Sequence, residues 1–407
     1  MSKKKLLFVS PIPLLPVHDG ASLRAYQFMR GLASISDLTL LCTEPANSDS
    51  KAHLQGLCRV CFAPMHSVNG SHKSRGILGH LQRLITPPAY YPPDRWIQFD
   101  PVFWSKVHEE NSRHNFDGIF CFGTASAGYG RWGKGSANVV IDHCDANSLW
   151  LFSQTMNFLR KKKMKDAMSS AYDLIYALRW ERSYLLPNHK HIVITERDAR
   201  WLRRSLPGGG DVFVVENGVD TDYFHPDLVS PGGNQSLIVF FGVMNYSPNH
   251  DAVCYFIKNI LPLIHEKKPE AIFRIIGRNP REELLLLAAA SKNVEVLGEV
   301  DDIRKYLRGA RVFVCPMREG AGMKNKVLES MAMAIPVVST REGVEGIRFD
   351  GGKMGFVADD PKFFADRVIA LMCSDSAWGD FSTRARSMVV EEYSWAEKAK
   401  KLAEVIF

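Results

Sequence analysis

The strongest constraint on the fold is a regular alternation of short apolar runs with longer amphipathic segments. In the first half of the chain these runs are rich in valine, isoleucine, leucine and phenylalanine: Leu6–Ser10, Leu38–Cys42, Gly118–Phe122, Val139–Asp142, His191–Thr195 and Val212–Glu216. Most runs are continuous, which is typical of parallel strands covered by helices on both faces. Helical patterns lie between them, for example at Ala21–Leu32 and Lys163–Leu186. The alternation predicts a doubly wound α/β domain.

The alternation stops and then restarts, which predicts a second domain. The segment from Pro226 to Gln235 contains two prolines and two glycines, a composition that suits a linker. Five further strands are predicted after it, at Ser236–Phe241, Ile272–Gly277, Val294–Leu297, Val312–Cys315 and Pro336–Ser339. We therefore predict two Rossmann-like domains, over residues 1–225 and 226–390, and a final helix within 391–407 that crosses back to the first domain.

Composition excludes several classes of protein. The hydrophobic fraction of 46% and the charged fraction of 23% are those of a globular protein. No apolar run reaches the roughly 18 residues that span a bilayer, and prolines interrupt the first apolar run, which we interpret as a buried strand of a cytoplasmic protein. Cys58 and Cys61 form a lone C-x-x-C without a second Cys or His pair. The cysteines are therefore expected to be reduced thiols.

The net charge of +7 is modest, but basic residues gather in one place. The run Arg160-Lys-Lys-Lys-Met-Lys165 lies in a stretch predicted to be helical, after Phe152 and Phe158. One interpretation is a solvated helix face, and the other is peripheral contact with anionic lipid headgroups at the inner face of a membrane. Nucleic acid is not expected as a partner, because no recognised binding module accompanies the run.

The clearest binding signal follows the predicted strand that ends at Cys315. A loop containing Gly320 and Gly322 comes next, and a helix is predicted to begin near Met323. Glycines let a backbone approach a ligand closely, and the first amides of a helix have no partners within it. This loop and helix start are therefore the first candidate for a phosphate site.

Basic and acidic side chains follow at once. Lys324 and Lys326 fall in the first turn of the predicted helix, where cations oppose the helix dipole unless an anion binds. We predict an anion site, with two lysines that point into water as the alternative. Glu329 lies three residues after Lys326 on a neighbouring part of the same face. It either accepts hydrogen bonds from ribose hydroxyls or forms an ordinary surface pair with lysine, and the spacing leaves both open.

Two segments of the first predicted domain place polar side chains after strands. Asp19, Gly20 and Arg24 join the first strand to the first helix, and Gly20 is expected to mark a tight turn. His143 and Asp145 follow another strand. Ligands of open parallel sheets bind beyond the carboxyl ends of the strands, which places both segments at the ligand-binding edge of the predicted sheet. A plain strand–helix connection and a structural histidine are the alternatives.

With these motifs in view, the sequence resembles a known family. The run from Cys315 to Thr340, followed by Gly343-Val-Glu-Gly346, is similar to the donor-binding signature of GT-B glycosyltransferases of the group 4, retaining type. Further segments match in the same order: Val215–Asp220, Phe241–Tyr246, Pro248–Val253, Ile275–Pro280 and Val294–Val300. The resemblance covers the second half of the chain almost completely and the first half more weakly. It implies two Rossmann-like domains that face each other across a cleft, and a role in bacterial polysaccharide biosynthesis.

The resemblance also assigns roles to residues. Lys326 is expected to neutralise the leaving diphosphate, with Lys324 as the second choice. Glu329 corresponds to the second acid of the family's E-x7-E pattern, which holds the donor ribose. The position of the first acid is Ala321, so this chain departs from the pattern where that acid contacts the donor sugar.

The remaining roles implied by the resemblance concern the edges of the site. His143, with Asp145, approaches the donor sugar, and Asp19, Gly20 and Arg24 border the reaction centre on the acceptor side. The other donor-binding residues are Gly242, Asn245, Arg278, Gly298, Val300, Gly320, Gly322 and Met323.

The expected reaction moves a sugar from a nucleotide-diphosphate sugar to a saccharide or lipid-linked acceptor with retention. No metal-chelating D-x-D stands in a plausible place, so lysines and helix amides are expected to meet the leaving-group charge without a metal or cofactor. The alternatives are a nucleotide-sugar epimerase of the same fold and a non-catalytic nucleotide-sugar- or saccharide-binding protein. An oxidoreductase ranks last, because neither domain shows G-x-G-x-x-G after its first strand.

Overall fold

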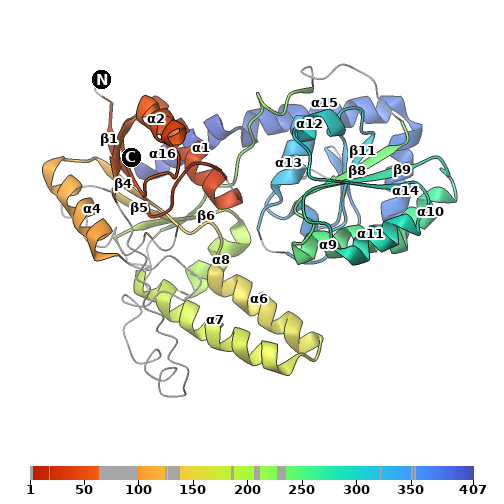
Figure 1. The fold of residues 1–407 in the computed structure, drawn as a ribbon, viewed down its shortest axis with the longest axis horizontal. Helices are drawn as coiled ribbons and strands as arrows, with labels where there is room; N and C mark the ends of the chain where they lie inside the picture. Colours follow the sequence, from red (N-terminus) through yellow and green to blue (C-terminus); the bar gives the residue numbers. More distant parts are fainter. Residues whose placement is uncertain are drawn as a thin grey trace. The chain divides into compact units, whose positions relative to one another are not determined.

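The chain folds into two compact α/β units. The computed structural model describes residues 3–17, 19–63, 100–123, 126, 138–184, 188–205, 211–226, 235–320, 322–349, 352 and 354–407. One unit comprises Met1–Glu216 with Lys398–Phe407, and the other comprises Asn217–Glu397 (Figure 1). Each unit contains one sheet whose strands are all parallel.

The sheet of the first unit has seven strands. Its strands, in chain order, are β1 (Lys5–Ser10), β2 (Asp37–Cys42), β3 (Arg59–Phe62), β4 (Gly118–Phe122), β5 (Asn138–Asp142), β6 (Lys190–Val193) and β7 (Val212–Val214). Their spatial order is β3-β2-β1-β4-β5-β6-β7. The chain therefore reverses direction across the sheet between β1 and β4, which is where open α/β sheets bind ligands.

Helices cover this sheet on both faces. They are α1 (Gly20–Ile35), α2 (Ser48–Leu57), α4 (Pro101–Arg113), α6 (Asn147–Arg160), α7 (Met164–Tyr184) and α8 (Glu196–Ser205). Central strands such as β4 are buried along their whole length, as the continuous apolar runs predicted. Helices α6 and α7 lie side by side as a hairpin (Figure 1).

The basic run Arg160–Lys165 is not one helical stretch, which corrects the sequence prediction. Helix α6 ends at Arg160, and Lys161 to Lys163 form the turn before α7 begins at Met164. Lys162 has a positive φ of 54°, a left-handed conformation that stops the helix. Sequence periodicity missed this break because the run contains no glycine or proline.

The sheet of the second unit has six strands. They are β8 (Leu237–Phe241), β9 (Ile272–Ile276), β10 (Val294–Gly298), β11 (Val312–Cys315), β12 (Val337–Ser339) and β13 (Gly355–Val357). The spatial order β10-β9-β8-β11-β12-β13 places the reversal between β8 and β11. The loops that follow these two strands therefore flank the expected ligand position.

The helices of the second unit complete the Rossmann-like pattern. They are α9 (Ser247–Tyr255), the π-helical turn Phe256–Ile260, α10 (Leu261–His265), α11 (Glu282–Ala289), α12 (Ile303–Leu307), α13 (Asn325–Ala332), the 3-10 turn Glu342–Val344, α14 (Pro361–Cys373) and α15 (Asp375–Tyr393). Helix α16 (Trp395–Ile406) follows and ends in the first unit. Among the described residues, no helix is both long enough and apolar enough to cross a membrane.

The units divide at Glu216, before the linker predicted at Pro226. Residues 217–225 stay with the second unit because they bond to it: Arg386 donates to the carbonyl of Thr221, and Arg304 donates to that of Tyr223. The chain returns to the first unit at Lys398. There the side chain of Asn138 binds the carbonyl of Ile406.

The predicted fold class, two doubly wound α/β domains, is confirmed. The strands β3 and β13 were not predicted. Strand β3 is only partly buried and contains Arg59, so its apolar signal is weak. Strand β13 has three residues and follows a glycine-rich polar segment. Both lie at an edge of their sheet, where less burial is required.

Candidate anion-binding site of the second unit

Two glycines shape the backbone after β8 and β9. Gly242 and Gly277 have φ values of 152° and 149°, a region that favours glycine. A Cβ atom at Gly277 would lie 1.7 Å from the carbonyl oxygen of Gly242, so only glycine fits there. The amide of Gly242 donates to Ile276, and that of Gly277 donates to Gly298. The loops after three neighbouring strands are thereby joined beside the point where the strand order reverses.

Lys326 points its ammonium group at this backbone. Its Nζ lies 2.5 Å from Oδ1 of Asn249 on α9 and 4.4 Å from the centre of the Phe240 ring. A Cβ atom at Gly242 would lie 2.9 Å from the same Nζ, so the glycine leaves room for the lysine. Sequence analysis placed Lys326 and Gly242 in the same site, and the structure brings them together.

Lys324 has a different environment from Lys326. Its Nζ donates to the carbonyl oxygens of Gly320 and Gly322, at 2.8 and 2.6 Å, and lies 3.9 Å from Glu342. The side chain is 6% exposed. Lys324 therefore holds the glycine loop in shape from within, whereas the prediction paired it with Lys326 at the ligand.

Helix α13 begins at Asn325, two residues after the predicted start near Met323. Gly322 has φ 75°, and Lys324 at the N-cap is extended with φ −93° and ψ 93°, so neither residue joins the helix. The N-cap residue, Lys324, makes no side-chain capping hydrogen bond, and the amide of Val327 donates to the carbonyl of Lys324. The start of α13 therefore lacks the usual side-chain cap from its N-cap position, which is compatible with a phosphate-binding helix.

Burial shifts the pKa values of Lys326 and Glu329, both on α13, so that each side chain is more easily neutralised. Loss of hydration lowers the pKa of Lys326 to about 8, opposed by the nearby Cys315 and Glu329. Burial also raises the pKa of Glu329 to about 7, opposed by Lys326. Both side chains are half-buried. An anion beside Lys326 would restore its full charge, so the site favours an anionic ligand.

The other predicted donor-binding residues lie at the carboxyl edge of the same sheet. Asn245 and Arg278 are exposed in neighbouring loops, joined by a hydrogen bond from the amide of Met244 to the carbonyl of Arg278. Gly298 ends β10 and Val300 lies two residues later, and Gly298 has a φ of 74°. Met323 is 8% exposed. Ala321 lies outside the described residues.

In the first unit, Arg24 is an interior residue. Its guanidinium binds Asp142 at the end of β5, with Nε 2.8 Å from Oδ2, and donates to the carbonyl of Val215 at 2.9 Å. Arg24 is 1% exposed and Asp142 is fully buried. The sequence suggested that Arg24 borders the acceptor, whereas its described contacts tie α1 to the sheet.

Asp19 and Gly20 form the start of α1. Asp19 is the N-cap, and its side chain accepts from the amide of Ser22 in a reciprocal capping box. Gly20 is the first helical residue and does not have a positive φ. Both residues are exposed.

His143 is buried, at 4% exposure. Its Nε2 lies 3.1 Å from Nδ1 of His191 on β6, and burial lowers its pKa to about 4. The imidazole is therefore neutral at pH 7. Asp145 is partly buried in the following turn and adds to the negative charge around Arg24.

Two residues that matter in these sites were absent from the predicted set. Asn249 holds the ammonium group of Lys326, and Asp142 holds the guanidinium of Arg24. Both had a sequence signal. Asn249 lies inside the motif Pro248–Val253 that carried the family resemblance, and Asp142 is a carboxylate at the end of a buried strand.

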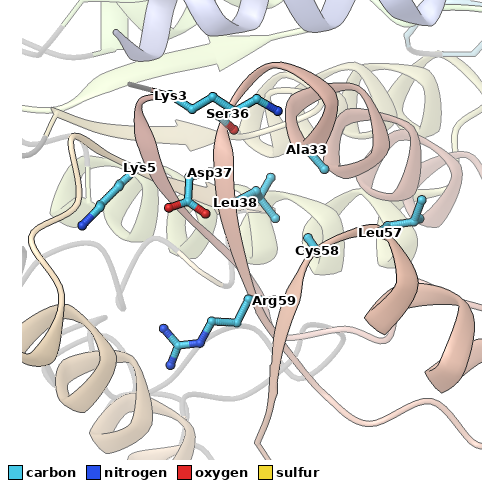
Figure 2. Close-up of a pocket in the computed structure, with 9 residues that line it drawn as sticks. All are labelled: Lys3, Lys5, Ala33, Ser36, Asp37, Leu38, Leu57, Cys58 and Arg59. Carbon is cyan, nitrogen blue, oxygen red and sulfur yellow. The ribbon is translucent and has the colours of Figure 1, made fainter. Parts of the chain in front are cut away.

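A surface hollow of about 420 Å³ lies elsewhere in the first unit (Figure 2). Lys5, Asp37 and Arg59, which begin β1, β2 and β3, line it. It is therefore at the amino ends of the strands, opposite the edge where parallel sheets bind ligands. This hollow takes no part in the candidate site.

The two doubly wound sheets have the GT-B architecture. In the second sheet, a glycine loop, the start of α13 and Lys326 lie where the strand order reverses. Residues 235–374 match the family model described as glycosyl transferases group 1. The chain is also 25% identical over 177 residues to an uncharacterized 44.6 kDa protein in the cps region of Klebsiella pneumoniae. That match covers 42% of this chain and 45% of the Klebsiella protein, less than half of each.

Solved structures resemble the chain over nearly its whole length. A glycosyltransferase from Rickettsia africae has a TM-score of 0.65 at 13% identity, covering 100% of this chain and 98% of that one. Alr3699/HepE from Anabaena, solved with UDP and glucose, has a TM-score of 0.62 at 13% identity, covering 98% of both chains. WaaG, a glycosyltransferase involved in lipopolysaccharide biosynthesis, has a TM-score of 0.62 at 11% identity, covering 98% of this chain and 99% of that one. At these identities the likeness shows the fold.

Proposed function

We propose that this chain is a glycosyltransferase that moves a sugar from a nucleotide-diphosphate sugar to a saccharide or lipid-linked acceptor with retention. The observation that carries the proposal is Lys326, whose ammonium lies between Asn249 and Gly242 where the strand order reverses. A diphosphate bound there would pair with the charged ammonium of Lys326 and accept hydrogen bonds from the first amides of α13. The group 1 family match covers this same segment.

The proposed reaction breaks the bond between the anomeric carbon and the phosphate oxygen. The acceptor hydroxyl forms the new bond on the same face of the sugar, and its proton passes to the departing phosphate. Negative charge grows on the diphosphate, so Lys326 and the α13 amides stabilise the transition state more than the ground state. Glu329 is proposed to accept hydrogen bonds from the ribose, and Lys324 to hold the glycine loop. No metal is required in this scheme.

Similar proteins support the nature of the substrates. Alr3699/HepE was solved with UDP-glucose, and TarM from S. aureus was solved with UDP and alpha-GlcNAc-glycerol. The Klebsiella relative lies in the cps region, and WaaG takes part in lipopolysaccharide biosynthesis. We therefore propose a place in bacterial surface polysaccharide assembly for this chain.

The decisive experiment is a panel of nucleotide sugars. Each is first tested for binding by calorimetry, and the one that binds is then incubated with lipid-linked saccharides. A glycosyltransferase releases nucleoside diphosphate in step with acceptor glycosylation, and NMR of the product reports its anomeric configuration. An epimerase would convert the donor without acceptor. A binding protein would take up the donor and release nothing, and either result would refute the proposal.

We also propose that the hairpin of α6 and α7 contacts an anionic membrane surface. Residues 159–166 are all exposed and include the basic run Arg160–Lys165. Exposed apolar side chains share one face of each helix at helical spacing: Phe152, Met156 and Leu159 on α6, and Met164, Met168 and Ile175 on α7. Apolar side chains beside lysines suit the interface of a bilayer that contains acidic lipids.

Vesicle sedimentation tests the hairpin. The protein is expected to bind phosphatidylglycerol vesicles and not phosphatidylcholine vesicles. Changing Lys161, Lys162 and Lys163 together to Glu should reduce binding by more than about tenfold. Changing the exposed Lys3, Lys4 and Lys5 to Glu alters the net charge equally and serves as the control. Equal losses in the two variants would indicate attraction by net charge alone.

A further inference from the structure

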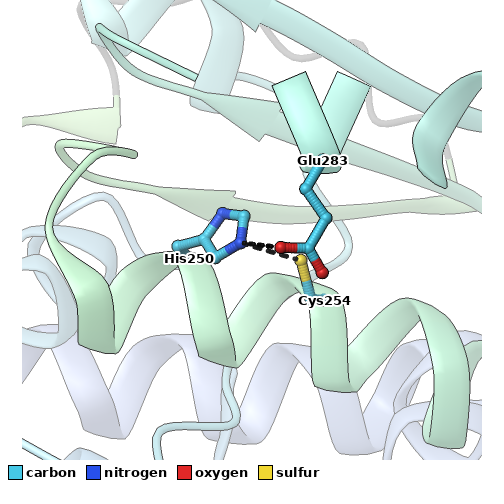
Figure 3. Close-up of side chains that lie close together, drawn as sticks. All are labelled: His250, Cys254 and Glu283. Carbon is cyan, nitrogen blue, oxygen red and sulfur yellow. Dashed lines mark hydrogen bonds and ion pairs between the residues drawn. The ribbon is translucent and has the colours of Figure 1, made fainter. Parts of the chain in front are cut away.

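Three potential metal ligands meet outside the anion site, between α9 and α11. His250 and Cys254 are four residues apart on α9, so both project from one face of that helix. Glu283 lies in the first turn of α11 and points towards them (Figure 3). One ligand atom from each residue lies within 4.8 Å of the other two. His250 and Cys254 are both 7% exposed, whereas the Glu283 side chain is 66% exposed.

The distances fit a tetrahedral zinc ion. Zinc–nitrogen and zinc–oxygen bonds of about 2.1 Å and a zinc–sulfur bond of about 2.3 Å separate ligands by about 3.4 Å for nitrogen and oxygen and about 3.6 Å for nitrogen and sulfur. Nε2 of His250 lies 3.3 Å from Oε2 of Glu283 and 3.7 Å from Sγ of Cys254. Two edges of a zinc tetrahedron therefore already exist between these side chains.

The charged side chains around the cluster leave Oε2 of Glu283 available to a metal. Lys258 lies 3.8 Å from Oε1 of Glu283, the oxygen that does not face His250. The guanidinium of Arg318 binds Asp251, with contacts of 2.8 to 3.2 Å. Both cations thus have carboxylate partners. A hollow of about 350 Å³ beside the cluster gives an ion a path from solvent.

We propose that His250, Cys254 and Glu283 bind a zinc-type divalent cation, with water as the fourth ligand. Binding replaces the thiol proton of Cys254 with the metal and releases that proton to solvent. The ion would tie α9 to α11. Asn249, the partner of Lys326, precedes His250 on α9, so the same ion would fix the helix that positions this lysine. The site does not depend on the proposed transferase activity.

Cobalt provides a direct spectroscopic test. The full chain, with any affinity tag removed, is stripped with a chelator and titrated with Co²⁺ in a thiol-free phosphine reductant. One equivalent should produce thiolate-to-cobalt charge-transfer absorption, which Zn²⁺ then displaces. Cys254→Ser should abolish that absorption. Cys373→Ser removes an exposed thiol of the same unit and should leave it intact.

Two further measurements guard against a folding defect in the serine variant. Glu283→Gln changes an exposed side chain and should weaken Co²⁺ binding by at least about tenfold, because loss of a metal ligand costs no less than loss of a residue that only hydrogen-bonds to a ligand. Zn²⁺ should raise the Tm of the wild type and not that of Cys254→Ser. Charge-transfer absorption that persists in Cys254→Ser, or none in the wild type at saturating Co²⁺, would overturn the proposal.

Discussion

The side-chain oxygen of Asn249 lies 2.5 Å from the ammonium nitrogen of Lys326, although 77 residues separate them in the sequence. The amide nitrogen of Asn249 donates to the carbonyl of Val243 at 3.0 Å, which fixes the direction of the side chain. Asn249 orients Lys326 without neutralising it. An amide partner therefore leaves the lysine charge available to an anion, whereas a carboxylate would compete with it.

Lys326→Ala is expected to lower kcat by about 10²–10³-fold, because it removes the positive charge nearest the proposed leaving group. The measurement is release of nucleoside diphosphate with the donor and acceptor identified by the panel. Lys267→Ala, an exposed lysine of the same unit paired with Asp366, is the matched control. Near wild-type turnover of Lys326→Ala would remove Lys326 from the proposed mechanism.

The affinity for nucleoside diphosphate should depend on pH on both sides of neutrality. The pKa of Lys326 is lowered to about 8, so affinity falls as pH rises through 8 and the ammonium is lost. The pKa of Glu329 is raised to about 7, so affinity falls as pH drops through 7 and the carboxylate is protonated. Calorimetry across this pH range measures both the acidic limb, where affinity falls below pH 7, and the basic limb, where it falls above pH 8. Glu329→Gln should weaken the fall in affinity on the acidic side and shift the fall on the basic side to lower pH, because Glu329 raises the pKa of Lys326.

The same shifts affect stability. Between pH 8 and 10.5 the unfolded chain retains the Lys326 proton that the folded chain releases, so this group makes stability rise with pH across that window. Between pH 4.5 and 7 the folded chain retains the Glu329 proton that the unfolded chain releases, so this group makes stability fall as pH rises.

Asn249→Asp should move the basic limb upward by about one to three pH units, because a carboxylate beside the ammonium favours its charged form. At pH 7 the same variant should bind nucleoside diphosphate more weakly, since the new carboxylate competes for Lys326. Asn259→Asp, on an exposed amide of the same helical segment, is the control. An unchanged basic limb in Asn249→Asp would show that Lys326 does not set it.

The sequence predicted most strands of both sheets, but not the contacts that the site residues make. Buried runs such as Gly118–Phe122 define their strands because both faces must be apolar. Helix starts were less certain: α13 begins after Lys324, whose side chain folds back onto the preceding loop. That contact is local and depends on the conformation of the glycine loop. The pairing of Asn249 with Lys326 depends on how distant segments pack, which spacing along the chain does not contain.

Arg24 shows the same limit. The family resemblance suggested that Arg24 borders the reaction centre, and only the packing of α1 against β5 shows that Asp142 accepts hydrogen bonds from its guanidinium. A buried arginine and an aspartate 118 positions away leave no pairwise signal in one sequence. By contrast, the caps at Asp19 and Asp302 are local and follow the usual N-cap preference.

Gly277→Ala should destabilise the second unit by about 2–4 kcal/mol, since its Cβ would collide with the Gly242 carbonyl and its φ is 149°. Thermal unfolding measures the change. Gly379→Ala, in α15 with open space around it, is the control and should stabilise the unit by about 0.5–1 kcal/mol. A loss in Gly277→Ala no larger than the scatter among surface variants would contradict the close approach of the two loops.

Removing one partner of the buried pair in the first unit should cost more than removing both. Arg24→Met leaves the carboxylate of Asp142 buried without its cation and is expected to cost about 3–5 kcal/mol. The double variant Arg24→Met with Asp142→Leu buries no charge, so it should regain part of that loss. Amide hydrogen exchange in β1 and β5 measures the opening free energy of this sheet by itself. If the single and double variants lost the same free energy of unfolding, the guanidinium would contribute through packing alone. The unpaired carboxylate of Asp142 would then not destabilise the protein.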